Sequence, residues 1–467
     1  MPICSLYIVL VKSVNRLLSI AIGLLFSVIG MKAANPTGTL PVVYINTTNN
    51  QAIDSKDVYV TGSLYIDPLS TGQTALGSAS SPVTAQFKGR GNYTWTGFDK
   101  KPYRIKFDAK QKVLGMPNNK HWCLLAHADD NLGFLRMPAA FRISEALGLR
   151  WTPRYRAVEL VINGSYKGLY FLTEHVRIAG NRVAITEQED SATDSVSGGW
   201  LVEIDNYRTE GNIEFTEGNG QDVMVSLKEP EVLSAQQRDY IVAQMNMLNT
   251  DLYDMSSGLE QRLDMTEAAK YYLVQEIMED CESYHGSCYL YKDRDRNGVV
   301  DKWKFGPVWD MGNAYMRHQE KWIYEDPTWP QYWIGQLAQW PAFQQAVKEQ
   351  WWIYYHTYKD QVRADIRAYA DEIETAARKD GDVWRSTSNY CDNSNYGDVR
   401  DRFFRRYDWR INWLYQQWGE GTKPVTWDIE HAADERPQSR KILRDGRIVI
   451  EANGCVYDLL GRKCAER

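Results

Sequence analysis

The chain has little cysteine or histidine for its size, with seven residues of each among 467. The cysteines are scattered, and no spacing among them is typical of a zinc site. Neither a structural zinc ion nor a dense disulfide framework is therefore expected to hold the fold. Cys281 and Cys288 flank one acidic turn, and we expect them either to pair across it or to remain buried thiols.

An excess of positive charge is also missing. The chain has 54 Lys and Arg residues against 60 Asp and Glu residues, which gives a net charge of −6. Proteins that bind nucleic acid normally carry a basic excess that attracts the phosphate backbone. No nucleic-acid partner is therefore expected.

Long apolar runs are scarce, and the one at residues 17–29 is too short to cross about 30 Å of hydrocarbon comfortably. Lys12 and Arg16 precede this run and the small residue Ala33 follows it. This layout predicts a secretory signal peptide at residues 1–34, with an uncleaved anchor as the alternative. After cleavage no stable membrane span is expected, and the protein would be secreted or part of the cell envelope.

Aromatic residues, in contrast, are abundant: the chain has 17 Trp and 29 Tyr, and 43% of its residues are hydrophobic. A chain of this length and composition can bury a large core and has room for two lobes. Residues 322–418 combine Trp, Tyr and Gln with a helical periodicity. We expect their aromatic side chains to pack helices together, with a glycan-binding platform as the alternative.

Arginines recur at helical spacing near the end of this region. We expect them either to bind an acidic partner or to pair with nearby acids. They are Arg402, Arg405, Arg406 and Arg410.

The chemistry is expected to centre on residues 264–315. Asp264 with Glu267 three residues later predicts a helix start. Glu276 and Asp280 then have the spacing of one helix face, where two carboxylates repel each other and the helix C-terminus disfavours negative charge. A metal ion or a nearby Lys or Arg is therefore expected beside them.

A hairpin follows this helix. Asn297 and Gly298 separate two β-rich runs and predict the turn between them. The second strand would then carry Asp310 back beside Asp280 and Glu282, which predicts an acidic site. The alternative is that these acids cap turns and solvate loops.

The tip of the hairpin has a partial resemblance to a calcium loop. Asp293, Asp295, Asn297 and Asp301 occupy suitable positions, but the closing position holds Lys304 in place of Glu. A plain solvated turn is therefore favoured over a calcium site.

Alternating apolar and polar residues from position 40 to 67 predict strands of a small sheet, and a glycine-punctuated basic segment follows. Glycines let backbone amides approach a phosphate, and cations neutralise its oxygens, so this segment is a candidate phosphate-covering hairpin. Basic edge strands that prevent aggregation are the alternative. Arg104 and Lys106 share one strand face, whereas Lys101 lies on the other.

Several short sequence blocks of the chain resemble those of one protein family and occur in that family's order. The phrases RGNYTW, KKPYRIKF, WCLLAHADD, INGSYKGLYFLTEHV, GGWLVEIDNY and FGPVWDMGNAY are similar to those of the spore-coat protein H (CotH) kinase family, over roughly residues 40–315. The resemblance implies an α+β, atypical protein-kinase-like two-lobed fold. It also implies the cofactors ATP and Mg²⁺ or Mn²⁺.

The resemblance also implies roles for individual residues. Arg90, Lys101 and Lys106 would contact the phosphates, and Glu174 would orient a cation or line the nucleotide cleft. Asp310 would bind the metal.

One departure from the family concerns catalysis. Where members usually have Asn and, two residues later, a catalytic Asp, this chain has Asp280 and Glu282. These two are the expected catalytic residues, and Asp280 is also an expected metal ligand beside Asp310. The extra methylene of Glu282 moves its carboxylate by about 1 Å or more, so a slow or inactive relative is also considered.

The expected organisation has four parts. The signal peptide at 1–34 precedes a β-rich lobe at 35–197 and a mainly helical lobe at 198–420 that carries the acid site. Residues 421–467 form a linker and a short β tail that resembles the sorting-type modules of secreted Bacteroidetes proteins.

The leading functional interpretation is a secreted CotH-like kinase that transfers the γ-phosphoryl group of ATP to a protein or other hydroxyl acceptor. A surface protein, a glycan or another envelope component is the expected partner. The alternatives are a non-catalytic surface or coat-assembly module and a carbohydrate-active hydrolase that uses Glu282 with Asp310.

Overall fold

The computed structural model describes residues 35–427, except 194, 206, 208–210, 217 and 219, together with the strand residues 440–444, 447–452 and 455–457. The predicted signal peptide lies outside the described residues and stays a prediction. Across the described residues, no helix is both long enough and apolar enough to cross a membrane.

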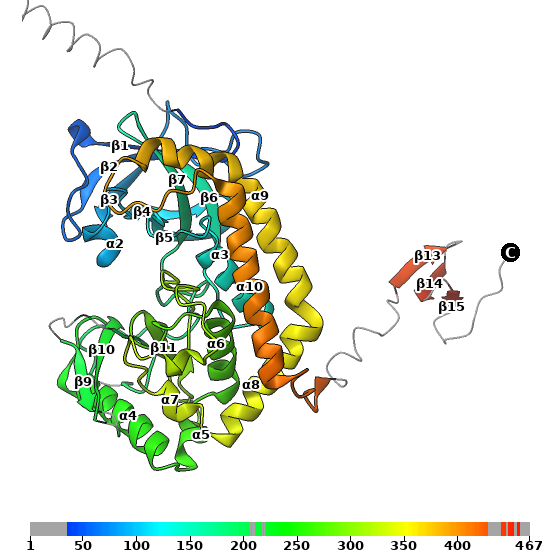
Figure 1. Cartoon of the computed structure of the whole chain (residues 1–467). Coiled ribbons are helices and arrows are strands. Elements are labelled where there is room, and N and C mark those ends of the chain that lie inside the picture. Colours follow the sequence, from blue (N-terminus) through cyan, green and yellow to red (C-terminus); the bar gives the residue numbers. More distant parts are fainter. Residues whose placement is uncertain are drawn as a thin grey trace, which may run out of the picture.

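The N-terminal strands close into a seven-stranded barrel in the order β1-β2-β3-β4-β5-β7-β6 (Figure 1). Neighbouring strands are antiparallel except β1 and β6, which run parallel and complete the ring. The strands are β1 (Val42–Thr47), β2 (Val60–Asp67), β3 (Val83–Gly89), β4 (Tyr103–Val113), β5 (Met116–Leu125), β6 (Tyr155–Ile162) and β7 (Ser165–Glu174).

Alternation along the strands separates the barrel interior from its outer face. Phe87, Ile105 and Trp122 are buried in one apolar cluster inside the barrel. Lys88 and Arg104 sit opposite each other on β3 and β4, on the other face. The strands were predicted from this alternation, but closure into a barrel was not, since the sequence contains no signal for the long-range pairing of β1 with β6.

A second, five-stranded sheet follows in the order β12-β11-β8-β10-β9. Helices α4 (Ala235–Tyr253), α5 (Gly258–Arg262) and α7 (Ile334–Leu337) lie in the same half of the molecule (Figure 1). The strands are β8 (Trp200–Ile204), β9 (Ile213–Thr216), β10 (Asp222–Glu229), β11 (Cys288–Lys292) and β12 (Lys304–Phe305). The expected boundary at 197/198 falls in the connection between β7 and β8.

The hairpin between β11 and β12 turns where the sequence predicted. Asn297 and Gly298 have φ of 53° and 75°, which is the left-handed backbone that favours Asn and Gly. Arg296 and Val299 form the bridge that closes the turn.

Long helices occupy much of residues 322–418, as their helical pattern predicted. In Figure 1, α9 and α10 run along one side of the molecule from the barrel toward the second sheet. The remaining helical elements are η1 (Thr48–Asn50), α2 (Tyr93–Thr96), α3 (Arg136–Ala146), α6 (Met265–Met278), η2 (Ile323–Glu325), α8 (Pro341–Ile353), the π-helical turn η3 (Tyr354–Tyr358), α9 (Lys359–Trp384) and α10 (Tyr396–Trp418).

The apolar core is shared between these parts. One cluster of buried side chains includes residues of the barrel's outer face, of the second sheet and of α6, α9 and α10. Aromatic residues of the helical region, such as Trp351, Tyr354 and Phe403, belong to it, which confirms their expected packing role. The α+β class is therefore confirmed, with a closed barrel as its main unpredicted feature.

At the C-terminus, β13 (Arg440–Arg444), β14 (Arg447–Ala452) and β15 (Cys455–Tyr457) form an antiparallel three-stranded sheet. The sorting role suggested for this tail stays a prediction.

Candidate active site

Helix α6 delivers two of the predicted acids to a turn. Asp264 caps the helix by accepting a hydrogen bond of 3.1 Å from the Glu267 amide, as the sequence predicted. The helix ends at Met278, and its C-cap Glu279 adopts left-handed backbone with φ of 48°. Asp280 and Glu282 therefore lie beyond the helix, and Asp280 does not share a helical face with Glu276.

The cation expected beside Glu276 is an arginine. Arg410 of α10 forms a fully buried ion pair with the Glu276 carboxylate. Arg410 Nε also donates to the Glu276 carbonyl at 2.8 Å, and Tyr272 donates to the carboxylate at 2.5 Å. Glu276 is thus a structural residue that ties α6 to α10 just before the acidic turn.

Four carboxylates gather at the end of this turn: Asp129, Asp280, Glu282 and Asp310. Burial raises the pKa of Glu282 to about 7, with further contributions from Asp310 and Asp129. Burial and the charge of Asp310 raise the pKa of Asp129 to about 6. Mutual influence of this kind requires the acids to lie near one another, so the predicted meeting of Asp310 with Asp280 and Glu282 is observed, and Asp129 joins them.

Asp280 is the most enclosed of the four, with 1% of its surface exposed. Its Oδ1 accepts from the Glu282 amide at 3.2 Å, whereas its buried Oδ2 accepts no hydrogen bond from the described residues. Burial, followed by the charge of Glu282, raises the pKa of Asp280 well above its usual range. A buried oxygen without a donor is a place where a bound cation would be stabilising.

A cavity of about 50 Å³ opens beside these acids and is lined by Arg90, Asp129, Trp309 and Asp310, among others. Gly312 keeps part of this space free. A Cβ atom at Gly312 would lie 3.1 Å from Asp129 Oδ2 and 3.6 Å from Asp310 Oδ1. The two carboxylates therefore face one small space that a side chain would fill.

Arg136 of α3 fixes the two loops that carry these carboxylates. Its Nη1 donates to the Gly312 carbonyl at 2.7 Å, and its Nη2 donates to Asn131 Oδ1 at 2.8 Å. On the other side, Asn313 Nδ2 donates to Glu282 Oε2. These bonds hold the loops after β5 and after Asp310 against the acidic turn.

Cations cover the neighbouring outer face of the barrel. Lys88 and Lys106 lie over the Tyr59 ring, at 5.0 Å and 5.7 Å from its centroid. Arg104 lies between them on β4 and approaches His121 Nδ1 at 3.4 Å, while its buried Nε finds no acceptor among the described residues. We call Lys88, Arg104 and Lys106 the cation face.

The positive charge of the cation face contributes to a lowered pKa of the neighbouring His121. Burial lowers the pKa of His121 to about 3, and Arg104, Arg177 and Lys106 add to the effect. Arg90 links this face to the four carboxylates Asp129, Asp280, Glu282 and Asp310, which we call the acid pocket. Arg90 packs over Trp309 at 5.5 Å and contributes to the lowered pKa of both His127 and His175. An anion is therefore favoured along this face, next to a pocket of carboxylates that favours a cation.

A family model described as "CotH kinase protein" matches residues 86–414, which include the cation face, the acidic turn and most of the chain. The chain belongs to the CotH kinase family. A search of curated proteins found no match.

Two other residues that the CotH resemblance had assigned to ATP lie in structural contacts. Lys101 Nζ donates to the Trp95 carbonyl at 2.6 Å and packs over the Trp95 ring. Glu174 is fully buried, and it accepts from the Arg154 amide at 2.9 Å and lies 3.9 Å from Arg182. Their roles in binding ATP stay predictions.

Arg104 and Asp129 were not predicted as site residues. Arg104 was recognised as basic, but only the register of β3 with β4 places it opposite Lys88. Asp129 occurs in the acidic phrase HADD of one CotH block, and nothing local distinguishes it from its neighbour Asp130. Asp130 instead accepts hydrogen bonds from the backbone amides of Leu132 and Arg136.

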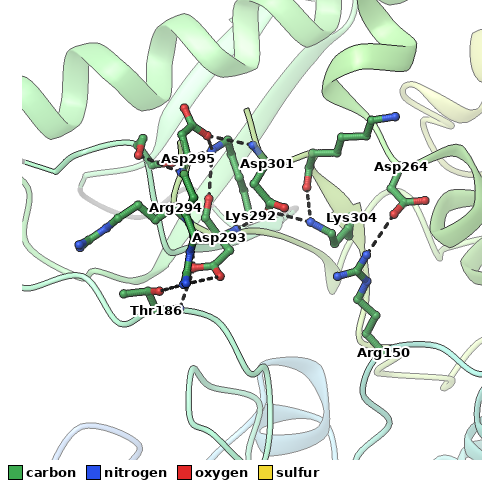
Figure 2. Close-up of polar contacts among 12 residues, drawn as sticks. Arg150, Thr186, Asp264, Lys292, Asp293, Arg294, Asp295, Asp301 and Lys304 are labelled. Carbon is green, nitrogen blue, oxygen red and sulfur yellow. Dashed lines mark hydrogen bonds and ion pairs between the residues drawn. The ribbon is translucent and has the colours of Figure 1, made fainter. Parts of the chain in front are cut away.

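The hairpin tip of this CotH chain has the arrangement of a closed polar turn. Figure 2 shows Lys292 reaching Asp295 and Lys304 reaching Asp301, at 2.5 Å and 2.7 Å. Asp301 also accepts from the Asp293 amide at 2.7 Å. Asp295 and Asp301 are thus paired with two buried lysines, and Asp293 is paired with Arg296 and the Thr186 amide. These contacts occupy the acids of the partial calcium loop, and the turn is held by internal bonds where a plain solvated turn was expected.

The structure also decides between a disulfide and two free thiols at the acidic turn. Cys281 and Cys288, which flank the acidic turn, are both buried free thiols. The disulfide considered across this turn is therefore absent.

The side chains of the site determine whether it can bind a metal ion. In the described part of the chain, no three His, Cys, Asp or Glu side chains stand close enough to hold a metal ion without moving. The carboxylates around Gly312 are nevertheless the hard oxygen donors that Mg²⁺ and Mn²⁺ prefer, and Asp280 Oδ2 has no donor of its own. These residues have the chemistry that such an ion needs, and their side chains would have to move closer together to bind it.

Proposed function

We propose that this CotH-family chain binds ATP with Mg²⁺ or Mn²⁺ and transfers the γ-phosphoryl group to a hydroxyl acceptor. The observation that carries the proposal is the juxtaposition of the cation face with the acid pocket, in which Asp280 is buried and Asp310 is exposed, with Arg90 between them. Phosphoryl transfer needs this pair of features, because catalysis consists mainly of positioning the phosphates and neutralising their charge.

Asp310, Asp280 and Asp129 would hold the divalent cation. When bound, the cation would neutralise charge on the phosphate oxygens. Arg90 and the cation face of Lys88, Arg104 and Lys106 would orient the phosphate chain from the barrel side. Arg136 acts on the protein itself, because it holds the loops of Asp129 and Gly312 in register.

Glu282 is the proposed proton acceptor for the attacking hydroxyl. The pKa of Glu282 is raised to about 7, which is close to neutral pH. A carboxylate with this pKa accepts a proton more readily than a carboxylate with an ordinary pKa. The hydrogen bond from Asn313 fixes one of its oxygens. Glu282, which stands where the family usually has Asp, thus has a defined position. Its longer side chain is still expected to slow the reaction.

The proposal is tested by radiolabel transfer from γ-labelled ATP with Mn²⁺, read as autophosphorylation and as release of phosphate. Glu282→Gln should lower the rate by about 100-fold or more, since the general base is lost. Glu320→Gln removes an exposed acid outside the pocket and is the matched control. A wild-type protein that is folded but has no ATP-dependent activity would contradict the proposal, as would an unchanged rate in Glu282→Gln.

For the cellular setting, we propose a secreted or envelope-bound protein of the Bacteroidetes type. The predicted leader at residues 1–34 and the tail sheet support this proposal. The acceptor would then be a surface protein or a glycan of the envelope.

A second candidate function is a non-catalytic binding module on the same scaffold. It is favoured by the observation that, among the described residues, no three metal-ligating side chains are already assembled. Such a module would bind its partner equally well after Asp310→Ala, whereas the kinase proposal predicts loss of ATP binding in that variant.

A further inference from the structure

A second depression lies on the other side of the acidic turn, between the end of α4 and the start of α7. It has a volume of about 670 Å³ and is lined by Tyr253, Tyr324, Trp329, Glu325, Gln336 and Gln339, among others. It is thus much larger than the cavity beside Asp310 and shares no lining residue with it. We call this depression the aromatic groove.

The floor of the aromatic groove is built by a braced loop. Gln331 Nε2 donates to the carbonyls of Cys281, Trp329 and Asp326 at 3.0, 3.1 and 3.3 Å. The Trp329 ring stacks on His285 with 5.0 Å between the ring centroids. The groove is therefore largely formed before any ligand binds, which lowers the entropic cost of binding.

The loop also connects the groove to the acidic turn. Gln331 contacts the Cys281 carbonyl, which lies between Asp280 and Glu282 in sequence. His285, which stacks on Trp329, donates its amide to the Glu282 carbonyl at 2.8 Å. One short turn thus carries the candidate catalytic carboxylates and supports the floor of the groove.

The chemistry of the lining restricts the ligand. No Lys or Arg is found among the described residues that line the groove, so phosphates and other anions are disfavoured. Two acids line it. Asp326 accepts a 2.8 Å hydrogen bond from Gln319 Nε2 and lies 3.6 Å from Arg317. The exposed Glu325 accepts a 3.1 Å hydrogen bond from the Trp322 amide. One exposed carboxylate among these lining residues is little charge to attract a basic peptide.

The other side chains that line the groove include aromatic rings and amide groups. The apolar faces of sugar rings pack on aromatic rings, and amides pair with hydroxyl groups as donor or acceptor. We propose that the aromatic groove binds a neutral oligosaccharide, with Trp329 and Tyr324 as stacking residues and Gln336 and Gln339 as hydrogen-bonding residues. This proposal stands independently of the kinase activity proposed above.

The groove is tested with the full chain by native electrophoresis in gels that contain a soluble neutral polysaccharide. Barley β-glucan, xyloglucan, galactomannan and dextran are the four probes. The wild-type protein should be retarded by at least one of them. Trp329→Ala should weaken that binding about tenfold or more, as expected for truncation of a central aromatic contact.

Two further variants separate binding from folding. Gln339→Ala changes an exposed side chain and should weaken binding while leaving the melting temperature unchanged. Tyr415→Ala removes an aromatic residue that is 39% exposed on α10, outside the groove, and should bind as the wild type does.

Two results would overturn the inference. These are no retardation of the wild type by any of the four polysaccharides, and unchanged binding in both Trp329→Ala and Gln339→Ala. Because none of these assays contains ATP, a failed kinase assay would leave the result intact, and the reverse also holds.

Discussion

The ion pair between Glu276 and Arg410 is expected to decide the stability of the acidic turn. Both side chains are fully buried, and Arg410 also donates to the carbonyls of Lys321 and Gln319 at 2.9 Å and 3.2 Å. In Arg410→Met the Glu276 carboxylate would stay buried without its cation. Removing one partner of a buried ion pair typically costs about 3–5 kcal/mol of unfolding free energy.

The assay is denaturant unfolding of Arg410→Met beside Arg405→Met, which removes an exposed arginine of the same helix and should change stability by less than about 0.5 kcal/mol. The double variant Glu276→Gln with Arg410→Met should lose less than the sum of the single variants, because the buried charge is gone. A loss below about 1 kcal/mol in Arg410→Met would show that Arg410 does not stabilise the buried Glu276 carboxylate.

Three further predictions concern the site and the hairpin. In the metal-free protein the pKa is raised to about 7 for Glu282 and to about 6 for Asp129, so protons compete with a cation for this site. The affinity for Mn²⁺ should therefore rise about tenfold between about pH 6 and pH 8. Glu282→Gln should make the affinity depend less on pH. Gly312→Ala should weaken Mn²⁺ binding roughly tenfold without lowering the melting temperature, because its Cβ would press on Asp129 Oδ2; unchanged affinity would contradict this use of the space. Gly298→Ala should cost about 1 kcal/mol of unfolding free energy, since its φ of 75° strains an alanine; a neutral result would count against the turn geometry.

Features governed by neighbouring residues were predictable from the sequence. The capping of α6 by Asp264 and the turn at Asn297 and Gly298 depend on a few adjacent residues, and both are observed. The approach of Asp310 to Asp280 and Glu282 followed from the hairpin, because an antiparallel pair returns the chain to where it started.

Features set by long-range contacts were not predictable. Closure of the barrel depends on the pairing of β1 with β6, which are more than a hundred residues apart. The cation that neutralises Glu276 comes from α10, and Arg104 faces Lys88 only through strand register. The sequence gives the type of such residues but not the partner that each one meets.

The central claim is that the acid pocket and the cation face together form a nucleotide site. Calorimetric titration of the purified protein with ATP and Mn²⁺, beside its Asp310→Ala variant, tests for this site. We expect micromolar binding by the wild type and its loss in the variant, with both proteins equally folded. No binding by the folded wild type, or equal binding by both proteins, would show that the acid pocket and the cation face do not form a nucleotide site.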